Sequence, residues 1–144
     1  MSSYEYIDDM AIADVAFIAR GQTLEELFHA AAEATMNVMV DELATIERKV
    51  ERTVEAEAEA EDLLLVNFLQ ELIYHKDSER LLLLPDELTV TRRDRRLAAR
   101  ARCSGEPLDP AKHELKVDVK AVTLHRLKVE QKPAGWEAFV ILDI

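Results

Sequence analysis

The stretch WEAFVILDI, residues 136–144, decides the fold because it has the pattern of an interior β-strand. Its alternating positions are apolar on both sides, with Trp136, Ala138, Val140 and Leu142 on one face and Phe139 and Ile141 on the other. Such a pattern is typical of a strand that is covered on both faces. We therefore predict that residues 136–144 form a central strand, which draws the end of the chain into the core.

The end of this strand carries two negative charges on neighbouring residues. Asp143 supplies a side-chain carboxylate and Ile144 supplies the α-carboxylate. Two unit charges about 5 Å apart repel by roughly 1 kcal/mol in water and roughly 3 kcal/mol at an intermediate dielectric. A partly buried pair of this kind favours a metal ion, a Lys or Arg side chain, or a helix N-terminus nearby.

A second strand that is apolar on both faces begins with another carboxylate. Asp14 precedes the run Val15–Ala19. If this strand and residues 136–144 are antiparallel neighbours, Asp14, Asp143 and the Ile144 terminus meet at one edge of the sheet. Three oxygen donors suit Ca²⁺ or Mg²⁺ better than Zn²⁺. The alternative is that Asp14 caps a turn and Asp143 is solvated at a frayed end.

Two stretches have the apolar spacing of helices. Thr23 begins the first one and forms a capping box with Glu26, and we expect this helix to end near Val40. Asp62 is expected to cap the second helix, whose stripe consists of Leu65, Phe68, Leu69, Leu72 and Ile73. Residues 75–78 are expected to end it.

The remaining segments read mainly as strands. Residues 4–7, 50–58, 88–91, 96–103, 117–125 and 127–130 have strand-like patterns. The apolar run 81–84 is cut by Pro85, and residues 132–135 form a turn into the last strand. The order strand, helix, strand, helix and then several strands predicts a single α+β domain over residues 1–144, with two helices on one large mixed β-sheet.

Composition limits the classes of function. The 144 residues include 29 acidic and 18 basic ones, and the net charge of −11 disfavours strong direct binding to nucleic acid. The single cysteine, Cys103, excludes an internal disulfide and a cysteine metal cluster. We expect a cytoplasmic protein without a membrane association, because no apolar run reaches membrane-spanning length and the N-terminus lacks a signal peptide.

The other chemically interesting residues have simpler explanations. His75, His113 and His125 lack the spacing of metal ligands, although His113 lies in a loop with two prolines, where a binding role is more plausible. The arginines at 92, 93, 95 and 96 can grip phosphate but are typical of a solvated hairpin turn. Three glycines are too few for a phosphate-cradling loop, and Cys103 and Ser104 have no partner base that the sequence supplies. These features argue against a self-sufficient enzyme.

Taken together, several motifs resemble those of the archease family over essentially the whole chain. The matching segments are residues 4–8 leading to Ala13-Asp14-Val15, residues 21–28, 61–64, 68–72 and 112–114, Gly105-Glu106, the run Val119–Thr123, and the terminal run Val140–Ile144. The Val-Lys-Ala-Val-Thr run and the terminal Asp-Ile are the more specific of these. The chain departs from the family pattern at Ala11-Ile12, where His-Thr is common, and at Leu124, where Tyr is common.

The resemblance implies a function and a site. Archeases assist an RtcB-type tRNA-splicing RNA ligase, promoting its guanylylation and turnover, and are not catalysts themselves. By match, the ligands of a divalent metal would be Asp14, Asp143 and the carboxylate of Ile144, with Ca²⁺ favoured and Mg²⁺ or Mn²⁺ as alternatives. Lys120 and His113 would be contacts for a partner or a phosphate, and Asp8 or Asp9 could join the metal site.

Two other functions remain open from the sequence. The first is a general chaperone or interaction module without metal chemistry. The second is a free-standing hydrolase that uses the carboxylates, which the lack of a convincing base or nucleophile disfavours.

Overall fold

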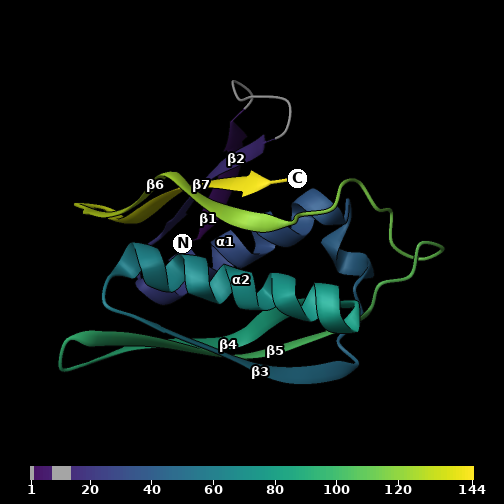
Figure 1. Ribbon diagram of the computed structural model, residues 1–144, viewed down its shortest axis with the longest axis horizontal. Helices are drawn as coiled ribbons and strands as arrows, with labels where there is room; N and C mark the ends of the chain where they lie inside the picture. The colour runs from purple at the N-terminus through teal and green to yellow at the C-terminus, as the bar shows by residue number, and fades with distance from the viewer. Residues whose placement is uncertain (1, 8–13) are drawn as a thin grey trace.

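The computed structural model describes residues 2–7 and 14–144, which form seven strands and two α-helices (Figure 1). In chain order the elements are β1 (Ser3–Ile7), β2 (Asp14–Gly21), α1 (Leu24–Met39), a short 3₁₀ turn (Leu43–Thr45), β3 (Val50–Ala58), α2 (Glu61–Glu79), β4 (Leu81–Arg93), β5 (Arg96–Pro107), β6 (Ala121–Lys132) and β7 (Gly135–Asp143). The predicted α+β class and the order of its elements are confirmed.

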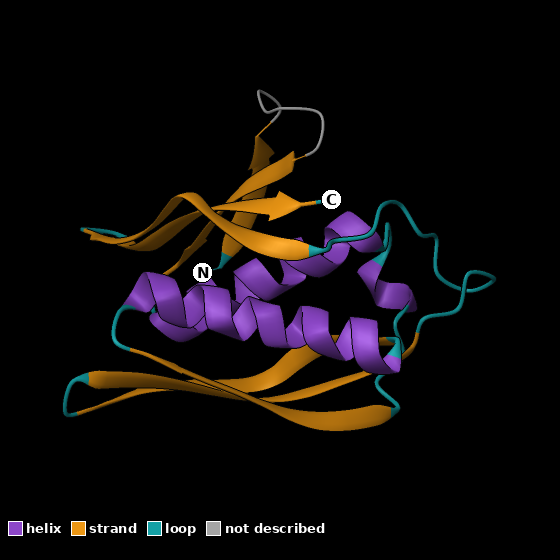
Figure 2. Cartoon of the chain, in the orientation of Figure 1, coloured by secondary structure: helices purple, strands orange, loops and turns teal. Residues whose placement is uncertain are grey.

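The strands form two antiparallel sheets, with the two helices as a layer between them (Figure 2). One sheet has the order β1-β2-β7-β6, and the other has the order β3-β5-β4. The prediction of one large mixed sheet is therefore wrong. The physical reason lies in the helices, which contact strands of both sheets and need apolar cover on two sides.

Helix α1 shows this requirement directly. The Thr23 hydroxyl accepts a hydrogen bond from the Glu26 amide at 3.1 Å, and the Glu26 carboxylate accepts one from the Gln22 amide at 3.0 Å. The predicted capping box is therefore confirmed, except that Glu26 binds the amide one residue before Thr23. The buried residues occupy nearly the whole circumference: Leu27, Phe28, Ala30, Ala31, Ala32, Ala34, Thr35, Met36, Val38 and Met39. A helix that is buried all round packs against a layer on each side.

Helix α2 begins two residues earlier than the predicted cap at Asp62 implies. Its N-cap is Ala60, whose side chain makes no capping bond, and Asp62 lies inside the first turn instead of capping it. Acidic side chains in the first turn still complement the helix dipole. The helix ends at Glu79 and is capped by Arg80, which adopts the left-handed conformation with φ of 56° and directs the chain into β4.

Two strand predictions also change. The run 81–84 and the strand 88–91 form one edge strand, β4, which passes Pro85 through a shift of register between Pro85 and Glu87. An edge strand tolerates proline because its outer N–H groups are not needed for pairing. The strand predicted from Val117 begins only at Ala121 and continues past a bulge between Thr123 and Lys128.

Strand β7 confirms the central position that residues 136–144 predict. It lies between β2 and β6, and its even-numbered residues pack toward the helices as part of the core: Ala138, Val140 and Leu142. Its other face is less completely covered, since Phe139 is only partly buried while Ile141 is 1% exposed. Neither helix described here has the length of apolar sequence that a bilayer span needs.

Candidate functional site

Three strand ends meet where β7 finishes, and we call this place the carboxylate corner. Asp14, the first residue of β2, lies directly opposite Asp143, the last residue of β7. Ala121, the first residue of β6, lies opposite Asp143 on the other side, and the Lys120 N–H donates to the Asp143 carbonyl at 2.8 Å. The antiparallel neighbours that the sequence analysis required are thus present, and Ile144 follows directly.

Both carboxylates of the corner lie on the face of the sheet that points away from the helices. Side chains alternate along a strand, so Asp14 shares a face with Arg20, and Asp143 shares a face with Glu137. Arg20 and Glu137 form an ion pair at 3.0 Å on that face. Val15 and Leu142, the neighbours of the two aspartates, belong to the helix-facing side. The corner therefore opens outward.

The two aspartates face each other without a compensating partner in the part of the chain that the structure describes. Residues that face each other directly in an antiparallel pair have Cβ atoms about 4.5–5.5 Å apart. Within residues 2–7 and 14–144, the Asp14 and Asp143 side chains form neither an ion pair nor a hydrogen bond. Their repulsion amounts to roughly 1–3 kcal/mol, depending on the local dielectric. An external cation would remove this cost.

The donor set of the corner fits a hard divalent ion only if it is completed by other oxygens. Among the described residues, no three His, Cys, Asp or Glu side chains lie close enough to hold a metal ion. The corner supplies two side-chain carboxylates, and the α-carboxylate of the half-buried Ile144 would be the third donor. Thr123 Oγ1, a buried hydroxyl that has no partner among the described residues, lies on the neighbouring strand. Oxygen donors of this kind suit Ca²⁺, Mg²⁺ or Mn²⁺. Asp8 and Asp9 lie outside the described residues.

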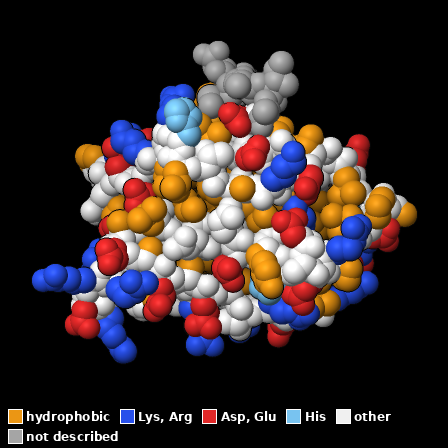
Figure 3. Space-filling view, viewed as in Figure 1, with side chains coloured by type: hydrophobic (Ala, Val, Ile, Leu, Met, Phe, Trp, Pro, Cys, Tyr) orange, Lys and Arg blue, Asp and Glu red, His pale blue; other side chains and the backbone are white. Residues whose placement is uncertain are grey.

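Lys120 is exposed at the rim of the corner, and the segment before it is held in place. Lys76, in α2, is 5% exposed, and its ammonium donates to the Val119 carbonyl at 2.9 Å and to Asp118 at 2.5 Å. In the space-filling view, acidic and basic side chains lie side by side near the end of β7 (Figure 3). A role for Lys120 in contacting a partner or a phosphate stays a prediction.

His113 is buried in an internal network instead of being offered to a partner. Its Nδ1 accepts the Asp109 N–H at 2.9 Å, so its Nε2 carries the proton and donates to Glu106 at 2.9 Å. Glu106 also accepts the Glu47 N–H at 2.9 Å and a hydrogen bond from the Lys112 ammonium at 2.9 Å. We call these residues the Glu106 network. A role for His113 in binding a partner stays a prediction, but its ring is 1% exposed and both nitrogens are in use.

The charges of the Glu106 network favour the ionised carboxylate. The backbone hydrogen bond from Glu47 and the contacts with Lys112 and His113 lower the pKa of Glu106 to about 2. The same Lys112 ammonium contacts the Glu47 carboxylate, and both of its acidic partners raise the pKa of Lys112. Glu106 therefore has a backbone donor, an ammonium and an imidazole N–H as partners within its own chain.

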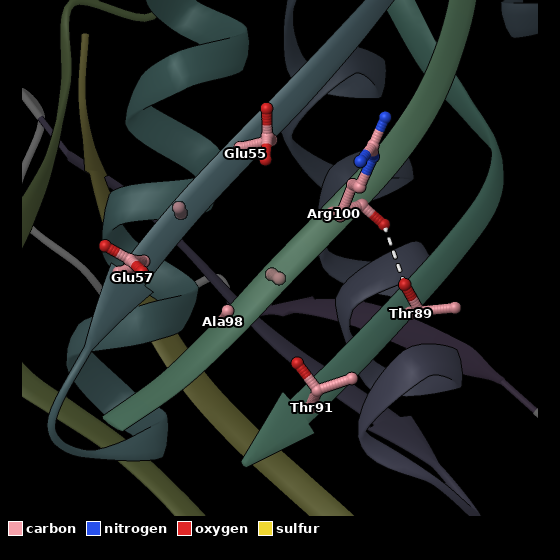
Figure 4. A pocket seen from close by; sticks show the side chains of 8 residues that line it. Glu55, Glu57, Thr89, Thr91, Ala98 and Arg100 are labelled. Carbon is pink, nitrogen blue, oxygen red and sulfur yellow. Dashed lines mark hydrogen bonds between the residues drawn. The ribbon is translucent and has the colours of Figure 1, made fainter. Parts of the chain in front are cut away.

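A separate hollow lies on the outer face of the β3-β5-β4 sheet (Figure 4). It has a volume of about 610 Å³ and runs between Glu55 and Glu57 on one side and Thr89 and Thr91 on the other, with Arg100 at one end. The Thr89 hydroxyl donates to the Arg100 carbonyl at 3.4 Å. Its lining is an open strand face that includes no histidine, cysteine or lysine side chain.

The arginines near the β4–β5 turn are solvated, as the sequence indicates. The side chains of Arg92, Arg93, Arg95 and Arg96 are all exposed, and Arg92 pairs with Glu61 at 3.4 Å. Basic side chains gather at this end of the molecule in the space-filling view (Figure 3).

Sequence reasoning missed two features of these sites. The Glu106 network was missed because its members come from a strand end, a loop and the approach to β3, which no spacing rule brings together. Thr123 belongs to the quoted Val119–Thr123 run, but the sequence alone does not show that its hydroxyl is buried without a partner.

Comparison with known proteins gives consistent results. Residues 4–144 match the Archease protein family (MTH1598/TM1083). The chain is 41% identical to Protein archease of Pyrococcus furiosus over 133 residues, which cover 92% of this chain and 93% of that protein. It is 33% identical to Protein archease of Methanosarcina mazei over 142 residues, which cover 98% of this chain and 95% of that protein.

Two solved structures have a similar fold. A protein of Methanobacterium thermoautotrophicum, MTH1598, solved in solution, superposes with a TM-score of 0.83 at 34% identity and covers 98% of both chains. A protein of Thermotoga maritima, described as an archease and possible chaperone, superposes with a TM-score of 0.62 and covers 93% of both chains. At 21% identity, the second likeness concerns the fold alone.

Proposed function

The chain belongs to the archease family, and from this premise we propose that it is a non-catalytic accessory protein of an RtcB-type tRNA-splicing RNA ligase. It promotes guanylylation and turnover of the ligase in the cytoplasm. The observation that carries this proposal is the direct pairing of Asp14 with Asp143, two adjacent carboxylates that have no cationic partner among the described residues. A surface with a net charge of −11 favours a protein partner over direct binding to RNA.

In this proposal the carboxylate corner holds a divalent ion, with Ca²⁺ favoured and Mg²⁺ or Mn²⁺ as alternatives. Asp14, Asp143 and the α-carboxylate of Ile144 are its ligands. The bound ion would supply positive charge against the triphosphate of the nucleotide that the ligase uses. The antiparallel ladder between β2 and β7 fixes the spacing of the two aspartates, and the central position of β7 fixes the chain end.

Lys120 adds a second positive group beside the ion. Its exposed side chain belongs to a segment that Lys76 holds through Val119, and its backbone N–H is bound to the Asp143 carbonyl. An ammonium at this place can contact a phosphate or an acidic group of the ligase. The corner and Lys120 together would form the part of the surface that approaches the ligase active site.

A ligation assay with variants of the corner tests the proposal. Asp14→Asn and Asp143→Asn remove one charge each and keep the size of the side chain, so we expect each to reduce multiple-turnover stimulation of the ligase at least tenfold. Asp94→Asn, in the solvated β4–β5 turn, is the matched control and should stimulate like the wild type. Full stimulation by both corner variants would overturn the metal-corner mechanism.

A general chaperone is the second candidate, because the Thermotoga maritima protein of similar fold is described as a possible chaperone. Such a function predicts that the protein suppresses aggregation of unrelated clients and that a chelator leaves this suppression unchanged. The ligase proposal predicts the opposite pattern, with a chelator-sensitive effect on one partner and little effect on unrelated proteins.

A further inference from the structure

The Thr123 hydroxyl is the one buried side-chain oxygen or nitrogen without a hydrogen-bond partner in the described part of the chain. Other buried polar groups are satisfied there. Thr35, for example, donates to the Ala31 carbonyl at 2.8 Å, and Lys76 donates to the Val119 carbonyl. Thr123 is therefore an exception that calls for a physical explanation.

The unpartnered hydroxyl is unfavourable for the fold by itself. A buried donor or acceptor without a partner loses its hydration and gains nothing in return. Valine has nearly the same shape as threonine and would fill the position without that loss. A hydroxyl at this place is thus expected to meet a polar group that binds from outside the chain.

The strand register places Thr123 next to the carboxylate corner. Thr123 pairs with Ile141 in β7, and the adjacent pair on the same face is Ala121 with Asp143. Thr123 is therefore the diagonal neighbour of Asp143, with Cα atoms about 7–8 Å apart, as is usual for such neighbours. The cross-strand partners on this face are small, with Ala16 opposite Ile141 in β2 and Ala121 opposite Asp143 in β6.

The backbone directly after Thr123 is irregular. The regular pairing of β6 with β7 stops at Thr123 and resumes at Lys128, and Arg126 within the bulge has φ of 55°. Bulges next to functional sites commonly re-aim a side chain or end the pairing of a strand. Thr123 is the last regularly paired residue of β6 before this bulge.

We propose that the Thr123 hydroxyl is a further oxygen of the divalent-ion site at the carboxylate corner, in contact with the ion or with one of its water molecules. This inference rests on the proposed function, because it requires an ion held by Asp14 and Asp143. A hydroxyl has two lone pairs and one proton, so it can bind a hard cation directly or bind a water ligand of that cation. Either contact gives the buried Thr123 hydroxyl the partner that it lacks among the described residues of the free protein.

Thr123→Val tests the inference by deleting only the hydroxyl. Titration with Ca²⁺ by calorimetry and with Tb³⁺ by luminescence should show a loss of affinity of about tenfold or more, the usual range for residues that support a metal site. Without divalent ions, the melting temperature of this variant should equal or exceed that of the wild type. Thr123→Ser keeps the hydroxyl and should retain an affinity within about threefold of the wild type.

The two readouts separate a role in ion binding from a structural role. A purely structural threonine would lower the melting temperature of Thr123→Val and leave the affinity unchanged. Affinity of Thr123→Val equal to that of the wild type overturns the inference. Luminescence decay of bound Tb³⁺ in H₂O and D₂O gives the number of coordinated waters. A gain of water in Thr123→Val supports direct contact, and an unchanged number with weaker binding supports contact through water.

Asp143→Asn in the same titration distinguishes failure of the inference from failure of the proposed function. If Asp143→Asn loses ion binding and Thr123→Val does not, only the role of Thr123 is wrong. If neither variant changes the affinity, the ion does not bind at the carboxylate corner and both proposals fail.

Discussion

The carboxylate corner and the Glu106 network place acidic groups in opposite electrostatic situations within one small domain. Glu106 is 5% exposed and is surrounded by donors from its own chain: the Glu47 amide, Lys112 and His113. Asp14 and Asp143 are only partly buried, yet within the described residues neither side chain has a donor. The more buried acid is the satisfied one.

This difference indicates that the two clusters have different roles, one in stabilising the fold and one in binding a ligand. A buried carboxylate needs internal partners if the chain is to fold, whereas a partly buried pair can be left uncompensated when a ligand supplies the charge. The Glu106 network joins the end of β5 to the segments before β3 and before β6, so its role is to hold loops together. The carboxylate corner joins three strand ends, and its two aspartates have no cationic partner in residues 2–7 and 14–144.

The largest effect is expected from removing the charge of the Glu106 network. Glu106→Gln keeps the shape but weakens charge-assisted hydrogen bonds, each of which contributes about 1.5–3 kcal/mol. We expect the free energy of unfolding in urea to fall by about 2–3 kcal/mol and the affinity for calcium to stay unchanged. Glu114→Gln, at an exposed position of the same loop, is the control and should unfold like the wild type. Equal stability of both variants would show that the network contributes little.

Acid should abolish the advantage of the wild type over Glu106→Gln. The pKa of Glu106 is lowered from 4.5 to about 2, so the unfolded chain binds its proton more readily than the folded one. This contribution to stability is complete above pH 4.5 and is lost as the pH falls toward 2. Urea unfolding of both proteins between pH 6 and pH 2 measures it. A constant difference across that range would contradict the assignment.

A smaller effect is expected at the carboxylate corner when the chain end is moved. Appending Gly-Ser-Gly after Ile144 displaces the α-carboxylate, and we expect calcium affinity to fall about tenfold, which is about 1.4 kcal/mol. The same tripeptide inserted after Asp94 in the β4–β5 turn should leave the affinity unchanged. Calorimetric titration compares the two proteins, and equal affinities would remove Ile144 from the set of ligands.

The smallest effect is expected from Asp143→Asn without divalent ions. Since Asp143 faces Asp14, loss of one charge relieves repulsion, and stability should rise by about 1 kcal/mol or less. High salt should reduce this gain because it screens exposed charges. Asp118→Asn offers the opposite case, because it removes a partner of Lys76 and should lower stability. A loss of stability in Asp143→Asn would mean that Asp143 already has a cationic partner.

The sequence predicted the elements of the fold better than their assembly. Period-two alternation located β3 from Val50 to Ala58, and the capping box located the start of α1. The division into two sheets was missed, although the apolar residues around the whole circumference of α1 indicate cover on two sides. Pro85 suggested a break in β4 because proline cannot donate to a ladder, but an edge position makes that donor unnecessary.

The pairing of Asp14 with Asp143 was predicted from the sequence, whereas the other features of the two clusters were not. Asp14 and Asp143 were found because each lies at one end of an apolar strand, where adjacency in the sheet brings them together. The unpartnered hydroxyl of Thr123 depends on burial, which no local pattern gives. The Glu106 network depends on a loop conformation, with Asp109 and His113 hydrogen-bonded to each other. Metal binding itself stays a prediction.

Stabilisation by calcium is the most direct test of the contrast between the two clusters. A ligand present at 100 times its dissociation constant stabilises the protein that binds it by about 2.7 kcal/mol. Urea unfolding with and without calcium should show this gain for the wild type and for Glu106→Gln, and no gain for the double variant Asp14→Asn, Asp143→Asn. The same gain in the double variant, or no gain in the wild type, would contradict a divalent-ion site at the carboxylate corner.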